Sequence, residues 1–255
     1  MALRKTEAAM KAEKCGKTSG SRYADPRLKK KASAVAELLK ELYPDARCSL
    51  EYNDDPWRLL VMARLSAQCT DERVNIVSRK LFQAYPTALA MSGAPLEDVE
   101  RLVRPCGLYR TKAKSIISAS RAICQRPDRS VPDNMTELLQ LDGVGRKIAN
   151  LIMGDVYGKG GIVADTHCIR ICGRLGFYPE DKKDPLYTEK VMSSLLPAEE
   201  QSDFCHRLVL FGRDCCRGRG TPKCEECRLS SLCDKYGGHE KTAGTDRMEI
   251  KQIEK

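Results

Sequence analysis

Four cysteines near the carboxyl end constrain the fold of this 255-residue chain more than any other feature of its sequence. Gaps of seven, two and five residues separate Cys216, Cys224, Cys227 and Cys233. Four thiolates spaced so closely can close around one zinc ion or one iron–sulfur cluster. The spacing alone does not choose between zinc and a cluster, and it leaves Cys215 as an alternative to Cys216 for the first ligand.

Composition narrows the class of protein further. The chain has 13 cysteines, and its first residues, Met-Ala-Leu-Arg-Lys, lack the apolar stretch of a secretory signal, so we expect reduced thiols rather than a disulfide framework. A hydrophobic content of 42% is enough for one large domain or two lobes, which excludes disorder of the whole chain. No 18 apolar residues run together, so no membrane-spanning helix is expected.

The positive charge is concentrated at one end. The net charge is +9, yet residues 1–31 hold ten Lys/Arg against three Asp/Glu, whereas residues 234–255 hold five of each sign. Both ends lack sustained apolar periodicity, so we interpret 1–31 as a basic, disordered arm and 239–255 as a polar tail. The arm fits two interpretations equally, a solvated tail or a tether to DNA.

Apolar residues recur at helical spacing through most of the body, and no alternating strand pattern occurs. The spacing and the flanking prolines predict an all-α protein of short helices. The expected helices cover roughly 35–42, 57–65, 71–85, 95–103, 112–123 and 135–141.

A glycine-bearing turn, Leu141-Asp-Gly-Val-Gly-Arg-Lys147, joins a helix that ends near Leu139 to one that begins at Arg146. Glycines let a backbone approach a partner closely, and the new helix offers unpaired N–H groups and a positive dipole end. Such a turn suits a DNA phosphate that is bound without reading the base, although Gly-x-Gly alone also fits an ordinary corner between two helices.

Lys147 follows this turn directly. At a partly buried helix start near other cations, where we expect it, a lysine loses its proton more easily and becomes a nucleophilic amine. The segment Val163-Ala-Asp-Thr-His167 places Asp165 eighteen residues further on. An amine and a carboxylate are the pair needed to attack a sugar C1′ and to stabilise developing positive charge. Taken alone, Asp165 also fits a helix N-cap, and His167 fits a structural histidine.

Together and in this order, these segments resemble the endonuclease III family of DNA glycosylases, in which a helix-hairpin-helix is followed by a Gly/Pro-rich loop and an aspartate. The likeness spans roughly 28–238 and includes Leu65-Ser-Ala-Gln-Cys-Thr-Asp71 and Gly107-Leu-Tyr109. It implies two helical lobes. One is a six-helix, barrel-like domain over 49–159 with the helix-hairpin-helix, and the other, formed by 32–48 and 160–238, carries a [4Fe–4S] cluster.

The resemblance also implies roles for single residues. It makes Lys147 the Schiff-base nucleophile and Asp165 the carboxylate that assists it. Gln68 and Leu108 match residues that fill the gap left when a damaged base is flipped out of the stack. The other matches are Gly143, Val144, Gly145 and Arg146 in the phosphate-binding hairpin, Thr166 and His167 in the site lining, and Cys216, Cys224, Cys227 and Cys233 as cluster ligands.

The implied activity is that of a bifunctional DNA glycosylase/AP lyase that excises oxidised pyrimidines from duplex DNA in base excision repair. The expected partner is double-stranded DNA with a damaged base or an abasic site, bound by a monomer without a membrane. The expected location is a cytoplasm of the prokaryotic type, in association with the nucleoid, with an organelle or nucleus as alternatives. Three other functions stay open: a monofunctional relative that removes adenine or a mismatched pyrimidine, a silent DNA-structure-binding module, and a zinc-stapled form of the same enzyme.

Three positions depart from the family pattern. Asp142 stands where a proline is expected, which puts an acid beside the phosphate site. The first cysteine gap has seven residues where six are usual, and Ile148 replaces a commoner threonine.

Overall fold

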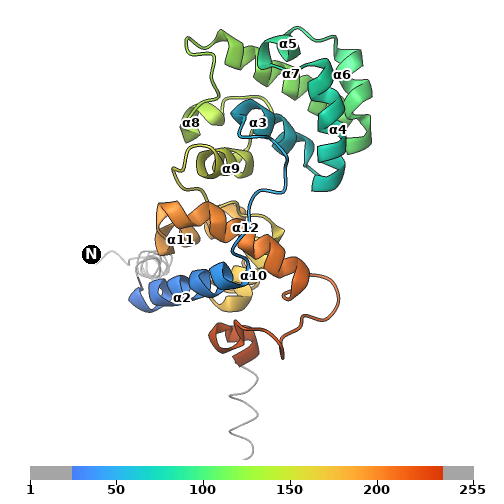
Figure 1. Cartoon of the computed structure of the whole chain (residues 1–255). Helices are drawn as coiled ribbons and strands as arrows, with labels where there is room; N and C mark the ends of the chain where they lie inside the picture. The colour runs from blue at the N-terminus through green and yellow to red at the C-terminus, as the bar shows by residue number, and fades with distance from the viewer. Residues whose placement is uncertain (1–24, 238–255) are drawn as a thin grey trace, which may run out of the picture.

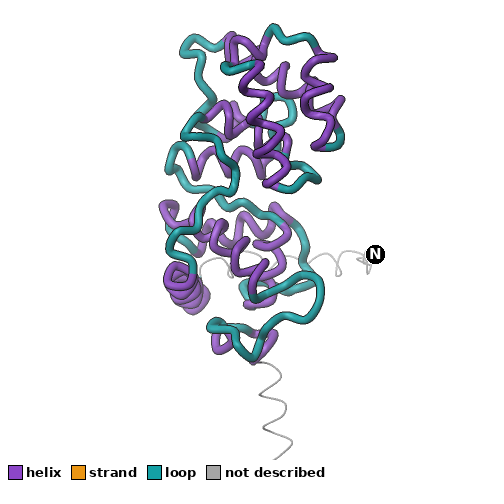
Figure 2. The backbone as a smooth tube through the Cα atoms, turned by 45° about the vertical axis from the view of Figure 1, so that its right-hand side comes forward, coloured by secondary structure: helices purple, strands orange, loops and turns teal. Residues whose placement is uncertain are grey.

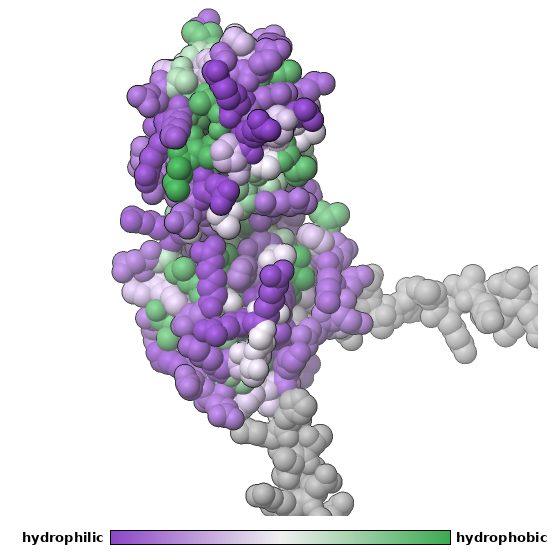
Figure 3. Space-filling model, turned by 90° about the vertical axis from the view of Figure 1, so that its right-hand side faces the viewer, coloured by the Kyte–Doolittle hydropathy of each residue, from purple (hydrophilic) through white to green (hydrophobic). Residues whose placement is uncertain are grey.

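The computed structural model describes residues 25–237, and helices form almost all of its regular structure. Two helical lobes are stacked on each other (Figures 1 and 2), and residues 25–237 contain no strand, so the all-α prediction is confirmed. Hydrophilic side chains cover most of the face in Figure 3, with hydrophobic ones between them in small groups. None of the described helices is long and apolar enough to cross a membrane.

The first lobe contains one continuous stretch of chain. Its buried core runs from Leu50 to Ile152. Trp57 anchors this core, since its indole N–H donates to the Ser120 hydroxyl at 2.9 Å and its ring lies 5.5 Å from that of Phe82. The helices of this lobe are α3 (Pro56–Leu65), α4 (Asp71–Ala84), α5 (Ala88–Ser92), α6 (Leu96–Val103), the 3-10 helix η2 (Arg104–Cys106), α7 (Tyr109–Gln125), α8 (Met135–Leu138) and α9 (Arg146–Asp155).

Between residues 49 and 159, all of which are described, seven α-helices occur where six were expected. The additional one is the five-residue α5, which has too few apolar positions to show a period. It forms because the Thr87 hydroxyl accepts the N–H of Ala90 at 3.2 Å and so caps the short helix.

The second lobe combines a segment that precedes the first lobe with the described residues that follow it. Its core draws on residues from Ala32 to Leu39 and from Ile162 to Leu229. Helix α2 therefore packs against α12, although the whole first lobe separates them in sequence (Figure 1). The helices of this lobe are α2 (Pro26–Leu42), α10 (Thr166–Leu175), α11 (Pro185–Leu195), α12 (Ala198–Asp214) and the 3-10 helix η3 (Ser230–Leu232).

Helix α2 corrects the prediction for the basic arm. The Asp25 carboxylate accepts the N–H of Arg27 at 2.9 Å, and Pro26 occupies the first helical turn. A side-chain cap followed by proline is a strong start signal, so the helix begins well before the apolar positions that revealed it. The prediction of a disordered arm is thus wrong for 26–31; the rest of that arm, 1–24, and the tail 239–255 lie outside the described residues.

Helix α9 contacts the second lobe through its C-terminal end. The ring of His206 on α12 places Nε2 2.9 Å from Oδ1 of Asp155, and the Ser202 hydroxyl donates to the same carboxylate. Gly154 lies so close to α12 that a Cβ there would be 2.7 Å from the Cβ of Ser202. These contacts hold the helix that carries Lys147 against the second lobe.

Candidate active site

The hairpin packs tightly onto the first lobe through Gly143 and Val144. Gly143 has a φ of +78°, and a Cβ at this position would lie 2.4 Å from Nε of Arg64 and 2.9 Å from Cβ of Ser115. Val144 is buried, and its N–H donates to the Leu141 carbonyl at 3.1 Å. The buried side chain of Val144 therefore anchors the turn in the core, while Gly143 allows the turn to approach α3 and α7.

The residues that follow the turn face outward. Gly145 is exposed and precedes the first helical residue of α9, with no side chain over the N–H groups of the first turn. Arg146 is exposed and pairs with Glu189 of α11, with Nε 3.0 Å from Oε2. Lys147 is also exposed, so the prediction of a partly buried helix start is wrong. Its position on α9 explains this, because the helix buries Ala149 and turns Lys147 to the opposite side.

A side-chain hydrogen bond brings the segment with Asp165 alongside α9. The amide of Asn150, three residues after Lys147, donates to the carbonyl of Ile162 at 3.0 Å, and residues three apart share a helix face. Gly161 permits this approach, since a Cβ there would lie 2.3 Å from the Asn150 carbonyl oxygen. The chain therefore runs alongside α9 as it approaches Asp165.

Asp165 is the N-cap of α10. Its Oδ1 accepts the N–H of Cys168 at 2.8 Å, which confirms the capping interpretation of this residue. The cap fixes the orientation of the carboxylate, which is half-buried, at the N-terminal end of α10. Asp165 thus serves the local structure and is available to the site as well.

The ring of His167 lies among several charges. Burial lowers its pKa; Asp165 acts in the opposite direction, and Arg170, Arg213 and Lys147 reinforce the lowering. Nη2 of Arg170 lies 3.2 Å from Nδ1 of the ring. Because arginine can only donate, Nδ1 accepts, which matches a neutral ring protonated at Nε2. The same environment therefore contains the amine of Lys147, the carboxylate of Asp165 and a neutral imidazole.

Arg170 is a site residue that the sequence did not indicate. Its guanidinium donates to the backbone carbonyls of Thr166 at 3.2 Å and Cys216 at 3.0 Å, so it joins the start of α10 to the cysteine loop. Thr166 itself is exposed beside Asp165. The only available signal was the spacing of Arg170 three and four residues after His167 and Thr166.

Two exposed residues stand on turns of the first lobe. Gln68 and Leu108 both have left-handed backbone conformations, with φ of +55° and +48°, and Leu108 is 55% exposed. Leu108 precedes α7, and the same helix reaches the hairpin further along, where the Ser118 hydroxyl donates to the carboxylate of Asp142. One helix therefore connects the turn of Leu108 with the hairpin, and Asp142 is held beside Gly143.

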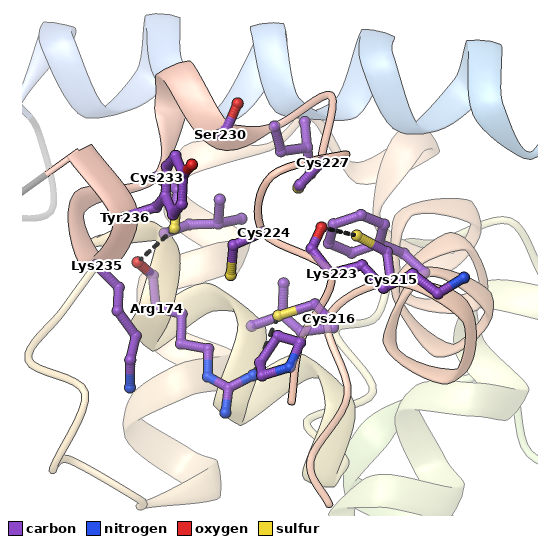
Figure 4. Close-up of a pocket in the computed structure, with 15 residues that line it drawn as sticks. Arg174, Cys215, Cys216, Lys223, Cys224, Cys227, Ser230, Cys233, Lys235 and Tyr236 are labelled. Carbon is purple, nitrogen blue, oxygen red and sulfur yellow. Dashed lines mark hydrogen bonds between the residues drawn. The ribbon is translucent and has the colours of Figure 1, made fainter. Parts of the chain in front are cut away.

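The predicted ligands line a single cavity of about 250 Å³. Figure 4 shows the sulfur atoms of Cys216, Cys224 and Cys233 turned toward one another, and Cys227 lies on the same wall. Nη1 of Arg174 donates to Sγ of Cys216 at 3.3 Å. The guanidinium places a positive charge beside this sulfur.

Cys215 also borders this cavity, and its sulfur donates to a backbone carbonyl, as does Sγ of Cys233 to the Arg174 carbonyl at 3.3 Å. Sγ of Cys215 donates to the Lys223 carbonyl at 3.5 Å (Figure 4), and burial raises the pKa of Cys215 to about 12. Within residues 25–237, no group of three or more His, Cys, Asp or Glu side chains is gathered closely enough to hold a metal ion. The cysteines thus share a cavity with open space between their sulfur atoms.

Comparison with known proteins places this geometry in context. Residues 61–198 match the model of the family described as HhH-GPD superfamily base excision DNA repair protein. The matched residues include the hairpin and Asp165 and end before the cysteine loop. The chain is 42% identical over 206 residues to endonuclease III of Synechocystis sp., covering 80% of this chain and 92% of that protein.

Two solved structures are similar to the whole described fold. One is a non-covalent endonuclease III–DNA complex, with a TM-score of 0.76 and 36% identity over 84% of this chain and 98% of that one. The other is a trapped endonuclease III–DNA covalent intermediate, with a TM-score of 0.76 and 36% identity over 83% of this chain and 98% of that one.

Proposed function

Because the chain belongs to the HhH-GPD superfamily of base excision DNA repair proteins, and within it to the endonuclease III family, we propose that it is a bifunctional DNA glycosylase/AP lyase. Its substrate is double-stranded DNA that contains an oxidised pyrimidine or an abasic site. The observations that carry this proposal are the exposure of Lys147 on α9 and the Asn150–Ile162 hydrogen bond, which holds the chain that leads to Asp165 against the same helix.

The chemistry follows from these two side chains. Nζ of Lys147 forms a bond to C1′ as the glycosidic bond breaks, and the departing base takes the bonding electron pair and then a proton. The Asp165 carboxylate stabilises the positive charge that develops on the sugar and accepts the proton that the amine must lose. The C1′–O4′ bond of the sugar ring then breaks, and O4′ takes its electron pair and a proton. The protonated imine that forms at C1′ acidifies C2′, and loss of a proton there expels the phosphate oxygen from C3′. The strand is cut on the 3′ side of the lesion.

The hairpin provides the contacts to the DNA backbone. Gly145 leaves the first N–H groups of α9 open to a phosphate, which gains from the positive end of the helix dipole. Gly143 and Val144 fix the conformation of the turn. Arg146 adds a positive charge, and its ion pair with Glu189 orients the guanidinium. Thr166 and His167 border the reacting sugar on the Asp165 side.

We further propose that Cys216, Cys224, Cys227 and Cys233 hold a [4Fe–4S] cluster. Four thiols around one cavity are a donor set that suits such a cluster, and Arg174 beside Cys216 supports the first ligand over Cys215. The cluster would order the loop that carries the basic residues Arg217, Arg219 and Lys223 and so direct them to phosphates. We also place the protein with nucleoid DNA in the cytoplasm, as a monomer, which the bacterial source of its relatives supports.

Borohydride trapping on a thymine-glycol duplex tests the function. Wild-type protein should form a covalent protein–DNA adduct, the adduct should map to Lys147, and Lys147→Ala should abolish it. Lys183→Ala is the matched control, because it removes an exposed lysine from the loop before α11, and its adduct should be unchanged. Base release without trapping by the wild type would refute the lyase activity, and an adduct with Lys147→Ala would refute the assignment of the nucleophile.

A further inference from the structure

Lys112 is a lysine buried completely inside the first lobe. Its side chain has no exposed surface, and its ammonium donates to three backbone carbonyls: Leu65 at 2.8 Å, Ala67 at 2.7 Å and Cys106 at 2.8 Å. An ammonium has three protons, and here each finds one acceptor. Lysines are almost never fully buried without such partners, because leaving water costs the charge its hydration. The fold therefore holds the ammonium of Lys112 where it donates to these three carbonyls.

The three carbonyls belong to two turns that are far apart in sequence. Leu65 ends α3 and, with Ala67, leads directly into Gln68. Cys106 ends the 3-10 helix η2 and lies two residues before Leu108. Carbonyls at helix ends carry the negative end of the dipole and lack partners within their own helix, so they are natural acceptors for a cation. Lys112 thus binds the bases of both turns at one point.

Both turns need such a restraint. Gln68 and Leu108 have φ of +55° and +48°, a left-handed conformation that is strained for any residue with a Cβ. Strained residues of this kind keep their conformation only where the surroundings determine it. Both side chains are exposed, so their own packing does not supply the restraint. The restraint comes from Lys112, whose ammonium binds the backbone that leads into each turn.

We infer that Lys112 is a positioning residue that sets the distance and direction between Gln68 and Leu108, so that both enter the duplex together when a base is flipped out. This rests on the proposed function, in which these two residues fill the gap in the stack. The ammonium does not touch DNA, because it is enclosed. It acts by making two independent turns into one rigid unit, which lowers the entropy lost when both side chains insert together.

The test compares two reactions of the same protein. Lys112→Met keeps an unbranched side chain of similar volume, one atom shorter, and removes the charge and its donors. We expect single-turnover base release from a thymine-glycol duplex to fall by about tenfold to a hundredfold, since small misplacements of aligned groups cost rates of that order. Cleavage at a preformed abasic site in single-stranded DNA should stay within about twofold, because no stack must be opened there. Lys114→Met, an exposed lysine on the same helix, is the matched control.

A cycle with Gln68→Ala/Leu108→Ala separates positioning from general stability. In that double-variant background, Lys112→Met should have little further effect on base release, since the side chains that it positions are gone. Equal loss of both reactions, or an undiminished effect in that background, would overturn the inference. If Lys112→Met does not fold, Lys112→Gln, which retains two donors, is judged by the same comparison. Wild-type protein that fails to trap at the abasic site would refute the proposed function and not the role of Lys112.

Discussion

Replacement of Gly143 by alanine should destabilise the protein by an amount that its surroundings determine. The left-handed φ of +78° costs an alanine about 1–2 kcal/mol. The new Cβ would also meet Nε of Arg64 at 2.4 Å and Cβ of Ser115 at 2.9 Å. Neither neighbour can move easily, because the two are joined by a 2.8 Å hydrogen bond and Ser115 is a buried residue of α7. Overpacking of this kind adds about 1–3 kcal/mol.

The free energy of unfolding should therefore fall by about 2–5 kcal/mol, which for a chain of this size lowers the thermal midpoint by roughly 4–20 °C. Gly145→Ala is the control, because the same hairpin there has an ordinary φ of −96° and nothing within 4 Å of the added Cβ. Its midpoint should stay close to that of the wild type, while its affinity for DNA falls, since the methyl group stands before the open end of α9.

Thermal unfolding followed by circular dichroism measures both variants under one condition. Equal midpoints for Gly143→Ala and Gly145→Ala would refute the reasoning, because the two substitutions add the same methyl group to one turn. A large loss in Gly145→Ala alone would show that the hairpin packs through its outer glycine, against the arrangement described above.

Three further predictions concern the cysteines, His167 and Asp142. Cys216→Ser should lower the iron content of protein purified without oxygen, and Cys215→Ser should not. The reverse result would make Cys215 the first ligand in place of Cys216. A colourless wild type that contains zinc would refute the cluster. Since burial lowers the pKa of His167, its neutral form contributes stability above about pH 6.5 that is lost as the pH falls through the lowered value in the folded state. The thermal midpoint of the wild type should therefore drop more between about pH 7.5 and about pH 5 than that of His167→Gln, and parallel curves would exclude this ring as the cause. Asp142→Asn should bind duplex DNA about two- to fivefold more tightly at low salt, with a smaller gain at high salt, because it removes a charge beside the phosphate site. An affinity equal to that of the wild type would mean that the carboxylate lies too far from the DNA to act on it.

Local sequence signals predicted much of the fold. The starts of α3 and α4 follow from Asp55-Pro56 and from Thr70 with two acids after it, since caps act within a few residues of the chain. The apolar period found α7 but gave it too short a span, because Arg110 and Thr111 in its first turn are polar and exposed. The hairpin, Lys147 and Asp165 were recognisable because each lies in a short run of unusual composition.

The sequence by itself determined which side chains are candidates for the chemistry, since an amine, a carboxylate and four thiols are properties of residues. Only the tertiary structure decided their environment. It exposed Lys147, brought the segment before Asp165 alongside α9, and enclosed Lys112 beneath Gln68 and Leu108. Such contacts join segments tens of residues apart, and their geometry depends on how whole helices pack, so no local pattern of residues encodes them.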